Sequence, residues 1–143
     1  MRRKRGYKRG YPVALVLGFE ADRAVLWQVF SNVIKLLHSL ELGGKRTEGR
    51  AMYKFHESVV DALRPVLKEG VRSVVVMAPA KTPYGADFLD HVRKHHAYMI
   101  QSKGSGDVTF AELVGSANQL RSVATLVKTE EFRKLVAETT SEE

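Results

Sequence analysis

The chain contains no cysteine, which excludes disulfide bonds and thiolate-based zinc sites and fits a cytoplasmic protein. It has no apolar run of about 18 residues, the length that a membrane-spanning helix requires. The apolar stretch from Pro12 to Phe19 is short, and no small-residue cleavage motif follows it, so we expect no secretory signal. These absences predict a cytoplasmic protein without a membrane partner.

Positive charge is present in excess and is unevenly placed. The 143 residues include 23 lysines and arginines against 16 acidic residues, which gives a net charge of +7. Six of the basic residues lie in the first ten positions, and without them 17 basic residues face 16 acidic ones. These six are Arg2, Arg3, Lys4, Arg5, Lys8 and Arg9. The remainder of the chain is therefore close to neutral.

This distribution, with 44% hydrophobic residues, predicts a single domain with one core. We expect residues 1–10 to form a basic, flexible arm that binds RNA phosphates and releases their counterions. A solubilising tail is the alternative interpretation of this arm. Residues 11–138 are expected to form one α/β domain, and residues 139–143 a polar tail.

The first half of the chain predicts three strands and a helix. Residues 13–19 and 24–30 are apolar runs separated by four mostly polar residues, which is typical of a hairpin. Residues 33–42 alternate in polarity and favour a third strand, although a helical spacing also fits part of them. From Met52 the period changes to that of a helix, which should stop near Gly70, with a kink or an early end at Pro65.

The second half predicts further alternating elements. Residues 72–78 form a continuous apolar run, as expected of a buried parallel strand. Thr82 is expected to cap a helix that runs to about His95, and residues 98–100 suggest a short strand. The pattern Thr109-x-x-Glu112 resembles a capping box and predicts a helix after it, residues 116–127 are ambiguous, and Thr129 should cap a last helix. This order of elements predicts a mixed sheet covered by helices.

A glycine-rich basic loop, residues 42–50, separates the third strand from the long helix. Its sequence is Leu-Gly-Gly-Lys-Arg-Thr-Glu-Gly-Arg. Glycine allows a sharp bend and a close approach to another molecule, and the excess of basic residues favours an anionic partner. A solvated connection with ordinary surface charges is the alternative interpretation.

Histidines at helical spacing raise the question of a metal site. Asp87, His91 and His95 fall at i, i+4 and i+8 of one predicted helix, and two histidines four residues apart can share a metal ion. No H-E-x-x-H pattern is present, and no further ligand is visible from the sequence. An exposed polar helix face is therefore the favoured interpretation, and we expect neither a metal ion nor an organic cofactor.

The order of elements resembles the middle domain of the eukaryotic and archaeal class I release factors and of the related Pelota. It is also similar to the release-factor-like peptidyl-tRNA hydrolases of ribosome quality control. Gly43-Gly44 stands after the third strand, where release factors carry Gly-Gly-Gln, and basic residues and a histidine follow in the next helix. The runs 74–79 and 87–92 are similar to a strand, turn and helix of Pelota. The match covers residues 10–127, and its strength lies in the position of the glycines within this order.

The resemblance implies an RNase H-like α/β domain that acts on peptidyl-tRNA in the peptidyl-transferase centre of the ribosome. It assigns catalytic positions to Gly43, Gly44 and Lys45, and RNA contacts to Arg46, Arg50 and Lys54, whereas the RNA contacts expected of the basic arm rest on its charge alone. It implies the ribosome and tRNA as partners, with a translational GTPase or flanking domains if the chain is part of a larger factor. Neither the codon-reading nor the partner-binding domain of the family is present in this sequence.

The sequence departs from the family pattern at the position after the glycines. Lys45 replaces the glutamine, so only a main-chain N–H remains there to orient water or polarise a carbonyl. Two functions follow as hypotheses, ester hydrolysis in termination or ribosome rescue and a non-catalytic RNA- or ribosome-binding module of Pelota type. A protein-interaction domain in which the loop has no role is a third.

Overall fold

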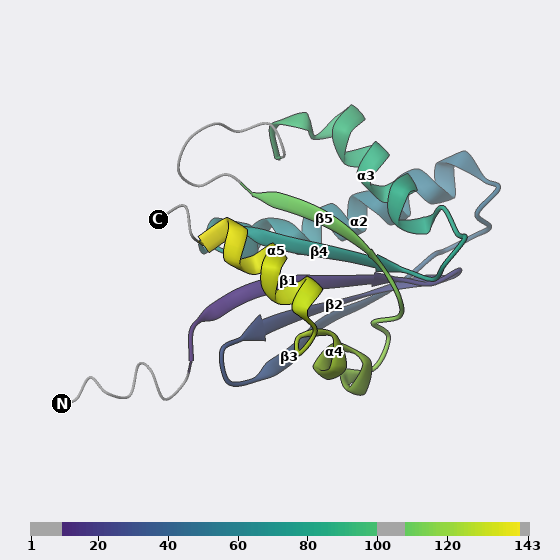
Figure 1. Cartoon of the computed structure of the whole chain (residues 1–143). Helices are drawn as coiled ribbons and strands as arrows, with labels where there is room; N and C mark the ends of the chain where they lie inside the picture. Colours follow the sequence, from purple (N-terminus) through teal and green to yellow (C-terminus); the bar gives the residue numbers. More distant parts are fainter. Residues whose placement is uncertain (1–9, 100–107, 141–143) are drawn as a thin grey trace.

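The computed structural model describes residues 10–99 and 108–140, and Figure 1 shows their arrangement. A five-stranded mixed sheet with the strand order β3-β2-β1-β4-β5 lies at the centre. The strands are β1 (Pro12–Phe19), β2 (Arg23–Phe30), β3 (Ile34–Glu41), β4 (Ser73–Ala78) and β5 (Thr109–Val114). The first three strands pair antiparallel, whereas β4 pairs parallel with both β1 and β5. The predicted α/β class with a mixed sheet is confirmed.

Four helices and one short 3-10 turn complete the described residues. They are α2 (Gly49–Lys68), α3 (Tyr84–His95), the 3-10 turn η1 (Ala97–Met99), α4 (Leu120–Leu126) and α5 (Glu130–Thr140). Helices α2 and α3 cover one face of the sheet, and α4 and α5 cover the other (Figure 1). No helix in residues 10–99 and 108–140 has the length and apolar character needed to cross a membrane.

Alternating side chains of β1 supply both layers of the core. Leu15 and Leu17 pack with the buried residues of α2 and α3, whereas Ala14 and Val16 pack with those of α4 and α5. All four are fully buried, because side chains alternate across a strand and both faces of this sheet are covered. The continuous apolar runs seen in the sequence are the consequence of this double cover.

Two predicted elements after α3 were wrong. The segment expected to begin a short strand at Tyr98 forms the 3-10 turn η1, and Ile100 lies outside the described residues. The Thr109-x-x-Glu112 pattern opens no helix, because residues 109–114 form β5. This strand pairs parallel with β4 from Ser73↔Thr109 onward, and the sheet edge provides hydrogen bonds that a local capping pattern does not reveal.

Helix boundaries differ slightly from those expected. Helix α2 continues through Pro65 to Lys68, so the early end is not observed. Helix α3 begins at Tyr84, after Pro83 as its N-cap residue, so Thr82 does not cap it. The Thr82 hydroxyl instead donates a hydrogen bond to the Pro79 carbonyl oxygen (2.8 Å) and stabilises the preceding turn. The expected cap at Thr129 is confirmed, because its hydroxyl oxygen accepts a hydrogen bond from the Phe132 N–H (3.2 Å).

Candidate functional site

The glycine loop connects the end of β3 to the start of α2, near the β1–β2 turn. The Leu42 N–H donates a hydrogen bond to the Asp22 carbonyl oxygen (2.9 Å), which attaches the loop to that turn. The Glu48 N–H donates to the Lys45 carbonyl oxygen (2.9 Å) and closes a tight turn before the helix. The loop, the β1–β2 turn and the β4–α3 connection lie at one end of the sheet (Figure 1).

The two adjacent glycines have different surroundings. A Cβ atom placed on Gly43 would have no heavy atom within 4 Å, so this position faces open space. Gly44 has φ +150°, and its Cβ atom would lie 2.6 Å from Glu48 Oε1 and 2.7 Å from the Ala51 Cβ. Backbone conformation and space both require glycine at position 44, whereas position 43 needs it only if another molecule approaches.

The main-chain N–H of Lys45 already has a partner. It donates a hydrogen bond to Glu48 Oε1 (2.8 Å), while the lysine side chain is exposed. Because this N–H was the donor expected to replace the family's glutamine, a reacting ester would have to displace the Glu48 carboxylate to use it. The same carboxylate lies beside Gly44 and is itself able to accept a hydrogen bond from water.

Arg46 is held within the chain, although it was expected to bind RNA. Its guanidinium lies over the ring of Tyr84, 4.1 Å from the centroid, and donates through Nη1 to the Ala21 carbonyl oxygen (3.2 Å). Its Nη2 lies 3.8 Å from Asp87 Oδ2, and only 20% of the side chain is exposed. Arg46 therefore connects the loop to the β1–β2 turn and to α3.

Other basic residues near the loop point to solvent. Arg50 and Lys54 lie one turn apart on the first two turns of α2, and both are exposed. Tyr53, between them in the sequence, is 47% exposed. Lys45, Arg50 and Lys54 together form what we call the basic strip. The six basic residues of the expected arm lie outside the described residues.

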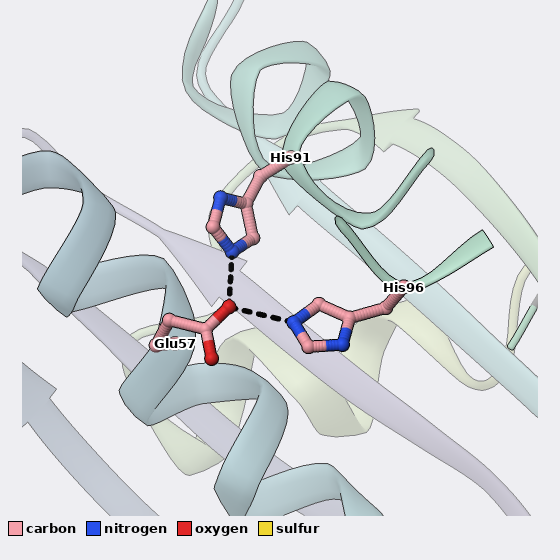
Figure 2. Close-up of side chains that lie close together, drawn as sticks. All are labelled: Glu57, His91 and His96. Carbon is pink, nitrogen blue, oxygen red and sulfur yellow. Dashed lines mark hydrogen bonds and ion pairs between the residues drawn. The ribbon is translucent and has the colours of Figure 1, made fainter. Parts of the chain in front are cut away.

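A second polar cluster joins α2 to α3 and lies partly inside the protein. Figure 2 shows Glu57 on α2 accepting two hydrogen bonds through Oε2, one from His91 Nε2 (2.8 Å) and one from His96 Nε2 (2.6 Å). The two histidines are 7% and 8% exposed. The exposed helix face expected for Asp87, His91 and His95 is therefore wrong at His91, although the other two are exposed.

Burial and the shared carboxylate shift the proton equilibria of this region. Burial, with smaller effects of the nearby charges of His91 and Arg46, lowers the pKa of His56 to about 4. Burial also lowers the pKa of His91, against the opposing effect of Glu57. The hydrogen bond from His96 lowers the pKa of the Glu57 carboxyl. At neutral pH these effects favour an ionised Glu57 beside neutral imidazoles of His56 and His91.

Sequence reasoning found the glycine loop but not the Glu57 cluster. Glu57 lies 34 residues before His91 and 39 before His96. Spacing along one helix suggested that His91 and His95 act together. In the tertiary structure His91 instead shares the Glu57 carboxylate of α2 with His96, the residue after α3. No local pattern contains this information.

Comparisons with known proteins agree on the fold. No protein-family model and no curated protein sequence matches the chain. Among solved structures, Dom34 of S. cerevisiae, described as a translation termination-like factor of RNA quality control that interacts with Hbs1, matches with a TM-score of 0.66 and 14% identity over 91% of this chain. Pelota of Archaeoglobus fulgidus matches with a TM-score of 0.64 and 16% identity over 95%. A model of ribosome-bound archaeal Pelota and ABCE1 matches with a TM-score of 0.67 and 14% identity over 90% of this chain.

The chain spans little more than a third of these proteins, 36%, 37% and 35% of their lengths. The matched part is their middle-domain region. At this level of identity the comparison establishes the fold. The chain therefore has the fold of the Pelota and Dom34 middle domain, as the order of elements predicted.

Proposed function

We propose that this chain, with its Pelota-type middle-domain fold, is a ribosome-associated domain that binds RNA through the glycine loop and the basic strip. The observation that carries the proposal is the exposed Gly43 and Lys45 at the tip of the loop, beside Arg50 and Lys54 on an otherwise nearly neutral body. Lysine and arginine side chains that meet phosphates release counterions and supply affinity without sequence preference. Tyr53, exposed among them, offers a surface on which a base can stack.

Arg46 has a different role in this proposal from Arg50 and Lys54. Its contacts with Tyr84, Ala21 and Asp87 hold the loop against the body, so it presents the loop and does not itself bind phosphate. An ordered loop loses less conformational entropy when it enters a crowded RNA site.

Peptidyl-tRNA hydrolysis is the second candidate function, favoured by the Glu48 carboxylate beside Gly44 and the Lys45 N–H. In this reaction water attacks the ester carbonyl, the acyl–oxygen bond breaks, and the products are a peptide carboxylic acid and the free hydroxyl of tRNA. Glu48 would orient the water, and the Lys45 N–H, once released, would donate to the oxyanion. The occupied N–H and the absence of glutamine from the loop make binding the better supported function.

Binding to purified, stalled ribosomes at several salt concentrations tests the proposal. The Arg50→Ala, Lys54→Ala double variant should lower the slope of log affinity against log salt by roughly 1.4 to 1.8, the loss of two phosphate contacts. The matched control is Arg133→Ala, Lys134→Ala on α5, which also removes two exposed basic residues but from the opposite layer. Equal slopes for the two double variants would contradict the proposed binding surface.

Single-turnover release of peptide from the same ribosomes separates the two candidates. The binding module predicts no release by the wild type despite salt-sensitive binding. Release by the wild type that disappears in a Gly43→Ala, Gly44→Ala variant would establish the hydrolase instead. A wild type that neither binds nor releases would overturn both candidates.

A further inference from the structure

We propose that Glu57, His91 and His96 form a binding site for one divalent transition-metal ion, and that Zn²⁺ fits their donor atoms. The site lies between α2 and α3 (Figure 2) and is separate from the glycine loop. It does not depend on the proposed function.

The three donor atoms converge from separate parts of the chain. The ligand atoms of Glu57, His91 and His96 all lie within 4.8 Å of one another. Both imidazoles direct Nε2 at the same carboxylate oxygen, at 2.8 Å and 2.6 Å. A tetrahedral zinc ion about 2.0–2.1 Å from each donor needs donor separations of roughly 3.3 Å. Small side-chain rotations meet this need, since Glu57 retains 27% exposure.

The donor set determines the kind of ion. Two imidazole nitrogens and one carboxylate suit zinc and its neighbours in the transition series, whereas magnesium and calcium prefer oxygen ligands only. Three protein ligands leave a fourth position for water or another group. The partial exposure of Glu57 gives an ion access to the two buried histidines.

A further histidine lies beside the three ligands, which must be neutral imidazoles and an ionised carboxylate to bind a metal ion. His56 adds a further buried imidazole next to His91, with 5.2 Å between ring centroids. It is 5% exposed, and its Nε2 has no hydrogen-bond partner among the described residues.

Arg64 competes with the metal for His96. Its Nη2 lies 3.2 Å from His96 Nδ1 and 2.9 Å from the Tyr98 hydroxyl. A guanidinium cannot accept a hydrogen bond, so Arg64 donates one to Nδ1 of His96. The proton of the imidazole ring then resides on Nε2. Binding of zinc at Nε2 moves that proton to Nδ1 and displaces Arg64 toward Tyr98 and Asp61, whose Oδ1 is 3.7 Å from Nη1.

A metal ion here would cross-link the two helices that flank the glycine loop. Helix α2 begins directly after the loop, and α3 supplies Tyr84 and Asp87, which hold Arg46. The site would therefore stabilise the framework that presents the loop, without contacting it.

Calorimetric titration of the EDTA-treated, dialysed full chain with ZnCl₂ tests the site. The titration should give one zinc ion per chain. Thermal unfolding with free zinc at about 100 times Kd should show a rise in Tm on the order of 8 °C. Glu57→Gln and His96→Gln should each weaken binding at least about tenfold. Arg64→Gln should bind zinc more tightly than the wild type, a change that a purely structural hydrogen-bond cluster would not produce.

His38→Gln is the matched control, because His38 is an exposed histidine on β3 that takes no part in the cluster's hydrogen bonds. It should leave zinc affinity unchanged. Co²⁺ substitution gives a second readout, since a tetrahedral site produces intense visible absorption that Glu57→Gln should abolish. Absence of zinc binding by the wild type, or full affinity in both Glu57→Gln and His96→Gln, would overturn the proposal, as would loss of binding in His38→Gln.

Discussion

At the scale of single residues, the glycine loop combines one position fixed by the fold with one left free. The positive φ of Gly44 and its closeness to Glu48 and Ala51 leave no room for a side chain. Gly43, its neighbour, meets no such restriction. The structural demand at position 44 and any functional demand at position 43 are therefore separable by mutation.

Gly44→Ala should reduce the free energy of unfolding by about 1–2 kcal/mol, because the new Cβ is strained at this φ and collides with Glu48 and Ala51. Gly43→Ala should change it by less than about 0.5 kcal/mol. Urea unfolding of both variants checks this difference. Equal destabilisation by the two substitutions would show that the loop conformation differs from the one described.

His56 should make stability depend on pH. Its folded pKa of about 4 lies below the ordinary value of 6.5, so the unfolded chain binds more protons between these values. The contribution of His56 to the free energy of unfolding is therefore fully present above pH 6.5. It falls by roughly 3 kcal/mol as the pH drops toward 4. His91 on α3 and Arg46 in the loop contribute charge to the same effect.

Urea unfolding between pH 7 and pH 4, with EDTA present to remove metal ions, measures this decline. His56→Leu should remove most of it, whereas His38→Gln, at an exposed position, should not. A decline of the same size in His56→Leu would assign it to other groups.

At the scale of elements, one buried hydrogen bond attaches the C-terminal layer to the sheet. Trp27 on β2 donates through Nε1 to the Ala117 carbonyl oxygen (2.6 Å), and Ala117 is fully buried. A Cβ atom on Gly18 of β1 would lie only 2.7 Å from the Ala117 Cβ, so a glycine is needed for this close approach. These contacts position the segment that leads into α4.

Trp27→Phe should destabilise the protein by about 1–3 kcal/mol, because it leaves the buried Ala117 carbonyl oxygen without its donor. Chemical denaturation measures the loss. Tyr53→Phe, which removes a polar group from a 47% exposed ring, is the control and should be nearly neutral. A loss of less than about 0.5 kcal/mol for Trp27→Phe would mean that water replaces the indole donor.

Besides the short segment at Tyr98, sequence reasoning misassigned β5. Its Thr109 and Glu112 match a capping box, yet β4 is a buried strand whose main-chain groups need partners on both sides. Pairing with β1 satisfies one side, and residues 109–114 satisfy the other. The requirement comes from a strand about 35 residues earlier, so local pattern could not reveal it.

At the scale of the whole molecule, charge is divided between the N-terminal residues and the body. Six basic residues precede position 10, and the remainder carries nearly balanced charge. We expect these six to contribute long-range, salt-sensitive affinity for RNA, while the basic strip contributes a local contact surface.

Replacing the six arm residues by glutamine keeps the chain length and should lower the salt slope of ribosome binding by up to about 4–5. The six residues are Arg2, Arg3, Lys4, Arg5, Lys8 and Arg9. Binding measured at several salt concentrations checks this effect, with thermal unfolding as the control for an unchanged fold. A slope equal to that of the wild type would show that the arm does not touch RNA.

The sequence by itself determined the α/β class, the first four strands, the long helix and the position of the glycine loop. These features depend on periodicity, apolar runs and turn residues, all of which act between near neighbours in the chain. The resemblance to Pelota also followed from the order of elements, and the structural comparison confirms the fold.

Only the tertiary structure decided what the side chains near the site do. In the sequence Arg46 is one of several basic loop residues, and only the fold shows that its guanidinium lies over the Tyr84 ring. The sequence also gives no partner for the Lys45 N–H, which in the structure donates a hydrogen bond to Glu48. The hydrogen bond between Glu57 and His91 depends on the packing of α2 against α3, which the sequence does not show. Contacts between residues distant in sequence depend on how elements pack, and single-helix spacing contains no information about that packing.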